Sequence, residues 1–367
     1  MPRNPYADLP SEAFWRSGVA AVDGPVSERI YSRKWPIPRR TKIATAGSCF
    51  AQHIGRQLQQ AGFGLLDVER APALLPAARR MDYGYGIYSA RYGNIYTVRQ
   101  MLQLAREAFG EIPQRNIVWE KDGRFYDGLR PTIEPAGLAD AQTVIAHRRW
   151  HLEQVRKLLV EMDLLIFTLG LTEAWVDTRD GTVFPLCPGT VTDDFDPEHH
   201  RFHNFGFVEI HEDFLALRTL LNAQRPPDRP LRFLLTVSPV PLTATAAGQH
   251  VQVATVYSKS VLRAVAGSLA DAHEDIDYFP SYEIVTSPWS GQRFYSENQR
   301  SVTAEGVACV MERFMASHGQ RPASPTVPPA PSERPAPATV PTAQEEEAML
   351  VKCDEELLDA FGKGPAA

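Results

Sequence analysis

The sequence predicts an α/β protein with a three-layer, doubly wound parallel sheet. Three short apolar, β-rich runs lead to this prediction, at residues 42–46, 163–169 and 231–237, and each is followed by a turn rich in Gly, Ser or Pro. Helical patterns of apolar residues lie between the runs. Strands that alternate with helices favour a parallel sheet covered by helices on both faces.

The first run leads into Gly47 and Ser48 and then into a predicted helix over 51–61, where Ile54 and Leu58 recur at helical spacing. Ser48 therefore lies in the turn between a strand and a helix, where unpaired backbone N–H groups gather and an oxyanion can be held. The bland alternative is that Ser48 only caps the helix. Further helices are predicted at 98–109, 151–162, 256–272 and 303–315, and a last short strand at 277–279.

Four segments are expected along the chain. Residues 1–40 are rich in proline and aromatic residues and predict an irregular arm that packs on the core, and 41–318 form one large domain. Residues 319–344 have the proline-rich composition of an extended linker. Residues 345–367 read as an acidic amphipathic tail.

The tail has two readings. Its apolar residues would share one side of a helix, and such a short helix is either mostly disordered alone or a tethered docking peptide for a protein partner. The residues expected on that apolar side are Leu350, Cys353, Leu357 and Phe361.

Composition and charge exclude several classes of function. The chain has 367 residues, 44% hydrophobic and 22% charged, with a net charge of -6, which gives no basic field for nucleic acid. We expect no membrane span, no metal and no cofactor, because no apolar run is long enough and no Cys or His spacing is that of a ligand set. The N-terminus lacks the apolar core of a signal peptide, so a cytoplasmic location is expected. The cysteines, expected as free thiols, are Cys49, Cys187, Cys309 and Cys353.

The segment that follows the first predicted strand carries a family resemblance. Residues 46–55 read AGSCFAQHIG, and the letters GSCFA at 47–51 are the motif that names the GSCFA family. The sequence is similar to that family over most of residues 40–316. The similarity continues through YGNIYT at 92–97, TLGLTEAW at 168–175, TVSPVP at 236–241 and YFPSYE at 278–283.

The resemblance implies a flavodoxin-like sheet of the kind found in SGNH/GDSL hydrolases, with Ser48 as the nucleophile. Gly93 or Asn94 would match the block that supplies an oxyanion donor. Thr172 stands where those hydrolases usually carry an asparagine in Gly-x-Asn-Asp, so its hydroxyl would replace an amide, or the turn is purely structural. Glu173 follows it and is a candidate to orient a histidine or to bind substrate.

The last family block lacks the expected base. In FYSENQRSVT at 294–303, Asn298 and Ser301 stand where the hydrolases carry Asp and His, and neither activates a serine. The favoured substitute is His203, which lies between aromatic residues in a long segment after the Gly170 block; the alternative is a loop histidine bonded to its own backbone. A Tyr-x-Lys spacing that ends at Lys259 is interpreted as helix surface.

The resemblance implies a serine esterase or O-acyltransferase that acts on a small-molecule or glycan ester, with carbohydrate-linked acyl groups favoured. The competing reading is a catalytically impaired module that binds a glycan or acylated ligand and a protein partner. The missing Asp-x-x-His block favours this second reading. An imidazole within hydrogen-bond reach of Ser48 would discriminate between the two.

Overall fold

The computed structural model describes residues 4–115, 117–290, 292–318, 351 and 353–362. The chain divides into two compact units. The larger unit spans Pro38–Tyr278 and Lys352–Ala367, and the smaller unit spans Met1–Ile37 and Phe279–Val351. The predicted linker at 319–344 lies outside the described residues.

The larger unit is built on a four-stranded parallel sheet in the order β1-β4-β8-β9. This confirms the prediction of an α/β protein with a parallel sheet. Every residue of β4 is buried, as is typical of a parallel strand with helices on its faces. The strands are β1 (Ile43–Gly47), β4 (Leu164–Leu169), β8 (Arg232–Val237) and β9 (Ile276–Tyr278).

A short extended segment continues the sheet beyond β1. Leu65 forms a single parallel bridge with Ile43, and the Ile43 N–H and C=O are bonded to Gly64 and Leu66. The segment is too short to count as a strand, but it covers the free edge of β1, which would otherwise expose unpaired backbone groups.

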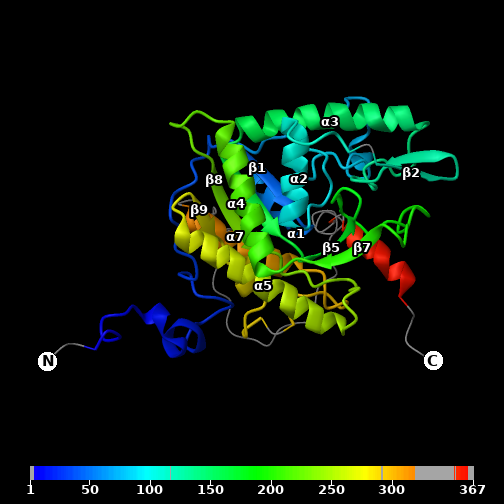
Figure 1. Cartoon of the computed structure of the whole chain (residues 1–367). Coiled ribbons are helices and arrows are strands. Elements are labelled where there is room, and N and C mark those ends of the chain that lie inside the picture. The colour runs from blue at the N-terminus through cyan, green and yellow to red at the C-terminus, as the bar shows by residue number, and fades with distance from the viewer. Residues whose placement is uncertain (1–3, 116, 291, 319–350, 352, 363–367) are drawn as a thin grey trace, which may run out of the picture. The chain divides into compact units, whose positions relative to one another are not determined.

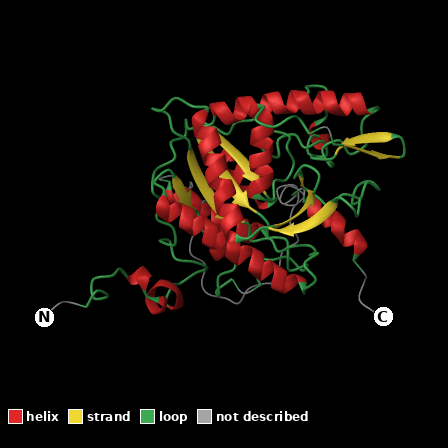
Figure 2. Ribbon diagram, in the orientation of Figure 1, coloured by secondary structure: helices red, strands yellow, loops and turns green. Residues whose placement is uncertain are grey.

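Helices flank this sheet (Figure 2). Helix α1 packs on β1 and β4, and α2, α4 and α5 pack one on the next, with α3 lying across the end of α2 (Figure 1). The helix starts are capped: the Thr97 and Asp140 side chains accept the N–H groups of Gln100 and Thr143. The bounds are α1 (Phe50–Gln60), α2 (Val98–Phe109), α3 (Ala141–Glu161), α4 (Phe207–Ala223) and α5 (Val251–Ala272).

Two small antiparallel sheets were not predicted, because their strands are short and mixed in polarity. One is a hairpin whose turn places Asp122 and Gly123 at positive φ. The other has the order β6-β5-β7 and follows the end of β4. The strands are β2 (Val118–Lys121), β3 (Arg124–Asp127), β5 (Glu173–Asp177), β6 (Val183–Phe184) and β7 (His200–Asn204). The short helices of this unit are η3 (Ala77–Arg79) and η4 (Asp354–Phe361).

The smaller unit combines the N-terminal segment with the residues that follow β9. Tyr31 packs edge-on against Phe279 and lies beside His318, and it is buried within this unit, whereas Tyr6 and Trp15 are exposed. The Arg313 guanidinium donates to the carbonyl of Val26. The elements are η1 (Ser11–Ala13), η2 (Arg16–Ala20), α6 (Ser281–Val285) and α7 (Ala304–Ser317).

Candidate functional site

Ser48 follows the last residue of β1 and precedes α1. The turn requires glycine at the preceding position, because Gly47 has φ +135° and an added Cβ would lie 2.3 Å from the carbonyl oxygen of Thr168. Ser48 is 3% exposed, and its Oγ has no hydrogen-bond partner among the described residues. A buried hydroxyl without a partner carries a desolvation cost, and such costs are often tolerated at functional sites.

The backbone N–H of Ser48 is already bonded. It donates to the Thr168 carbonyl at 3.1 Å, which continues the β1–β4 ladder by one residue. The sequence predicts that backbone N–H groups at this turn hold an oxyanion. In this structure an oxyanion at Ser48 would depend on other donors.

The turn after β4 packs directly against Ser48. A Cβ added to Gly170 would lie 2.9 Å from the Ser48 Cβ, so only glycine fits there. The N–H groups of Gly170 and Leu171 both donate to the Tyr96 carbonyl, at 3.2 and 3.0 Å. The close approach of these two turns fixes the position of Ser48 relative to the strand ends.

Two buried residues of α5 support that turn. The Lys259 Nζ donates to the Gly170 carbonyl at 2.7 Å, and the Ser258 Oγ accepts the Thr172 N–H at 3.1 Å. The interpretation of this segment as helix surface is wrong for both residues, which are buried, and only Tyr257 is exposed. Spacing did not reveal this, because the contact depends on how α5 packs on the strand ends.

Asn94 lies near the Ser48 turn, because the Tyr88 hydroxyl contacts both. It is 2% exposed and follows Gly93, which has φ +70°. Its Nδ2 donates at 2.8 Å to Oδ2 of Asp354, a residue of the C-terminal segment, and the other Asp354 oxygen accepts the Thr132 hydroxyl at 2.7 Å. The amide predicted to bind an oxyanion is therefore bonded to a carboxylate.

Tyr88 connects Asn94 to the Ser48 turn. Its hydroxyl lies 3.2 Å from the Ser48 carbonyl oxygen and also within hydrogen-bond distance of Asn94 Oδ1. Gln52 on α1 donates to the same hydroxyl at 3.2 Å. Burial raises the pKa of Tyr88 well above its usual range, so it remains a protonated donor.

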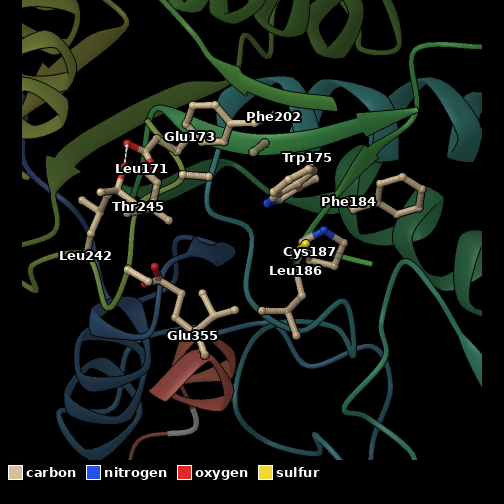
Figure 3. Close-up of a pocket in the computed structure, with 15 residues that line it drawn as sticks. Leu171, Glu173, Trp175, Phe184, Leu186, Cys187, Phe202, Leu242, Thr245 and Glu355 are labelled. Atoms are coloured by element: carbon tan, nitrogen blue, oxygen red, sulfur yellow. Dashed lines mark hydrogen bonds between the residues drawn. The ribbon is translucent and has the colours of Figure 1, made fainter. Parts of the chain in front are cut away.

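An apolar cavity of about 200 Å³ lies beside this cluster. An engineered cavity of about 150 Å³ holds a benzene ring, so a larger acyl or aromatic group fits here. Figure 3 shows Trp175 and Phe202 on one side of the cavity and Glu355 on the other. The described residues that line it include Leu171, Phe184, Leu186, Cys187, Leu242, Thr245 and Leu358.

Glu173 is the first residue of β5, in the β6-β5-β7 sheet, and Thr172 precedes it. The Glu173 Oε1 accepts the Thr245 hydroxyl at 2.8 Å, and burial raises the pKa of Glu173. The Thr172 N–H is bonded to Ser258, and its Oγ1 has no partner among the described residues. Glu173 therefore lines the cavity and accepts a hydrogen bond from a threonine.

The structure does not bring His203 to Ser48. His203 lies on β7, and its Nε2 is 2.9 Å from Oε1 of Glu209, at the start of α4. Consecutive side chains alternate across a strand, so His203 faces away from the side on which Phe202 lines the cavity. Its role as general base stays a prediction.

The residues of the last family block and His53 of α1 have structural contacts of their own. In the smaller unit, Asn298 donates from Nδ2 to the Ser301 hydroxyl at 2.9 Å, and its Oδ1 accepts the Ser301 N–H. These bonds form a local polar turn. His53 is buried against the Phe50 ring, and burial lowers the pKa of His53 to about 3.

The sequence reasoning missed a buried His–Glu pair. His151 Nδ1 lies 2.7 Å from Glu69 Oε2, and the Arg91 N–H donates to the same oxygen. Burial lowers the pKa of His151 to about 4, so the imidazole is neutral. Its Nε2 has no partner among the described residues, and it borders a cavity of about 20 Å³ that has room for one water molecule.

Comparison with known proteins supports the resemblance seen in the sequence. The GSCFA family model matches residues 42–314, which is well over half of the chain. The chain belongs to the GSCFA family. Searches among curated proteins and among solved structures gave no match.

Two negative observations apply to this GSCFA protein. In the part of the chain that the structure describes, no group of three or more His, Cys, Asp or Glu side chains is arranged to hold a metal ion. Within the same residues, no helix is both long and apolar enough to cross a membrane.

Proposed function

We propose that this GSCFA protein is a serine esterase or O-acyltransferase with Ser48 as its nucleophile. The observation that carries the proposal is the position of Ser48: a buried hydroxyl without a hydrogen-bond partner among the described residues, at the carboxyl end of β1 in the parallel sheet. Ligands of open α/β sheets bind in the crevice at the carboxyl ends of the strands.

The sheet order supports a flavodoxin-like, SGNH-type fold. If the Leu65 bridge is counted as the second strand, the parallel order becomes 2-1-3-4-5, with Ser48 after the first strand. This is the order of flavodoxin-like folds, in which the first strand adjoins the switch point of the topology. A fold hosts many chemistries, so the activity rests on the site rather than on this order.

The surroundings of Ser48 fit an acyl-transfer reaction. The Ser48 proton would pass to a base as Oγ bonds to the acyl carbon, and the base would return it to the leaving oxygen as the ester C–O bond breaks and the alcohol departs. Water or an acceptor hydroxyl would then take the acyl group from Oγ, and its proton would restore the Ser48 hydroxyl. The Asn94 amide, which donates to the Asp354 carboxylate in this structure, is the side-chain donor that we propose for the negative oxygen. The apolar cavity beside Leu171 would hold the acyl chain or a ring of the substrate.

The base contact is not formed in this structure. Catalytic hydrogen bonds are often long in the absence of substrate and tighten only when it binds. The proposal therefore requires a base to approach Ser48 on substrate binding. Carbohydrate-linked esters and a cytoplasmic location remain part of the proposal.

A second function is favoured by one specific observation. Among the described residues no imidazole lies within hydrogen-bond distance of Ser48 Oγ, which is the expectation for a module that binds an acylated ligand without cleaving it. Hydrolysis of a panel of p-nitrophenyl esters with different acyl chains distinguishes the two. The enzyme reading predicts release of nitrophenol that is lost in Ser48→Ala, whereas the binding reading predicts the same background rate in both.

A further inference from the structure

The C-terminal segment is seated in an unexpected orientation. The amphipathic pattern places Cys353, Leu357 and Phe361 on the buried side, but Leu357 and Phe361 are 42% and 67% exposed. The buried residues are Cys353 and the two acidic residues that follow it, Asp354 at 5% and Glu355 at 6% exposure. Burial of carboxyl groups with a Leu and a Phe left in water opposes the hydrophobic effect, so specific polar contacts must hold the segment.

Asp354 makes two of those contacts. One carboxylate oxygen accepts Asn94 Nδ2 at 2.8 Å, and the other accepts Thr132 Oγ1 at 2.7 Å. The recess around the carboxylate is also lined by Gln52 and Tyr88, and the free volume left in it is only about 10 Å³. A water molecule needs at least this much space, so the carboxylate fills the recess.

The next residues extend the contact to the apolar cavity. The Glu355 N–H donates to the Tyr96 hydroxyl at 3.3 Å, and the Tyr96 carbonyl binds the Gly170 turn that backs Ser48. Glu355 and Leu358 both line the cavity, and Figure 3 shows Glu355 facing it from the side opposite Trp175. The segment therefore forms part of the cavity wall and at the same time contacts Asn94 and Tyr96 beside the Ser48 turn.

We propose that Asn94 and Thr132 form a carboxylate-binding site whose resident ligand is the chain's own segment 353–361. While Asp354 is bound, the segment closes the Ser48 site and the apolar cavity. A substrate gains access only after the segment leaves, and a ligand with a carboxylate or another anionic oxygen competes with Asp354 for the same two donors. The consequence for catalysis rests on the proposed function of Ser48, whereas the binding site does not.

The chemistry of the site suits a reversible ligand. Both donors are neutral, and a carboxylate held by neutral donors is bound less strongly than one paired with arginine. The segment is joined to the rest of the chain through residues 319–350, a covalent connection that raises its effective concentration at the site. Such a segment is displaced more readily than a core element.

Thiol alkylation of the full chain tests whether Asp354 holds segment 353–361 in place, and it does not depend on enzymatic activity. Cys353 is 8% exposed in the segment, and Cys187 lines the cavity, where burial raises its pKa to about 11. We expect Asp354→Ala to accelerate alkylation at both cysteines by tenfold or more, because it removes two hydrogen bonds to a charged group. The matched control is Asp359→Ala, an exposed acid of the same helix, which should leave both rates unchanged.

A second variant guards against a local effect of the substitution. Thr132→Val removes one donor and leaves the sequence of the segment unchanged, so it should also accelerate the alkylation of Cys187 and Cys353. Rates normalised to the unfolded chain correct for intrinsic reactivity. Equal alkylation rates in wild type, Asp354→Ala and Thr132→Val would overturn the proposal. Faster alkylation of Cys353 with an unchanged rate at Cys187 would also overturn it.

Labelling of Ser48 by a fluorophosphonate separates this inference from the proposed function. If the alkylation rates rise as expected but no variant labels at Ser48, the carboxylate site stands and the enzyme reading fails. If Ser48 labels equally fast in wild type and Asp354→Ala, the enzyme reading stands and closure by the segment is refuted.

Discussion

Asn94 and Asp354 are 260 residues apart in the sequence, and the side-chain amide of one donates to the carboxylate of the other at 2.8 Å. The family resemblance pointed to Asn94 as a donor for a negative oxygen, and this oxygen is supplied here by the chain itself. Asn94 Nδ2 has two N–H groups, but a carboxylate held on one of them would repel an oxyanion held on the other. The two roles of Asn94 therefore oppose each other, and this connects the C-terminal segment to the Ser48 site.

The Gly47 turn gives a prediction on stability. Gly47→Ala should destabilise the protein by several kcal/mol, because it combines a positive φ with a Cβ 2.3 Å from the Thr168 oxygen, and strained positions alone cost about 1–3 kcal/mol. Gly181→Ala is the matched control: Gly181 also has positive φ, but an added Cβ meets nothing within 4 Å. Denaturant unfolding of both variants measures the difference, and equal losses would refute the clash.

The buried ion pairs on α3 give a second prediction. Arg148 is bonded to Glu107 at 2.8 Å and lies 3.5 Å from Asp127, with all three side chains buried. Arg148→Ala should cost about 3–5 kcal/mol, because it leaves the buried Glu107 carboxylate without its cation, whereas Asp127 keeps Arg130. Arg79→Ala, in an exposed pair with Asp82, should give no measurable change. Similar unfolding midpoints for the two variants would contradict this account.

Acid sensitivity follows from the buried histidines. Burial lowers the pKa of His151 to about 4 and that of His53 to about 3, below the ordinary 6.5. The unfolded chain thus takes up these protons first, so their stabilisation is present above pH 6.5 and is lost as pH falls from 6.5 towards 4. Each contributes a slope of about 1.4 kcal/mol per pH unit in that window.

The measurement is the free energy of unfolding between pH 7 and pH 4.5. The free energy of unfolding of His151→Gln should fall less steeply with decreasing pH than that of wild type, because about one proton fewer is taken up on unfolding. This holds whatever the effect of the substitution on absolute stability. His199→Gln, at a half-buried position, is the control. An unchanged slope in His151→Gln would show that this imidazole is not buried in its neutral form.

His203 gives a test of the sequence-based choice of base. Because its Nε2 is bonded to Glu209 and its side chain faces away from the cavity, His203→Ala should leave the rate of fluorophosphonate labelling at Ser48 within twofold of wild type. General-base catalysis contributes about 10²–10⁴-fold. A rate loss of a hundredfold would restore His203 as the base.

The sequence predicted the features that depend on local patterns. The strands before Ser48 and at 163–169 and 231–237 are apolar runs with clear turn residues, and each agrees with a strand of the structure to within one or two residues. Helix α2 has the predicted bounds. The position of Ser48 after a strand was predicted directly from this pattern of an apolar run followed by turn residues.

Other features depend on contacts between distant parts of the chain. Helix α3 begins ten residues before the predicted start, because Asp140 caps a polar first turn with little apolar periodicity. Strand β7 is short and polar, so the side on which His203 lies was not readable. Asp354 had no local signal, because its partners Asn94 and Thr132 are separated from it by more than two hundred residues.

The most direct test is intact-mass spectrometry after treatment with a fluorophosphonate. Wild type, Asp354→Ala, Ser48→Ala and the Ser48→Ala/Asp354→Ala double variant are compared at equal exposure to the probe. We expect a single adduct that forms faster on Asp354→Ala than on wild type and is absent from both chains that lack Ser48. No adduct on any chain would contradict a nucleophilic Ser48 and would favour the reading as a binding module.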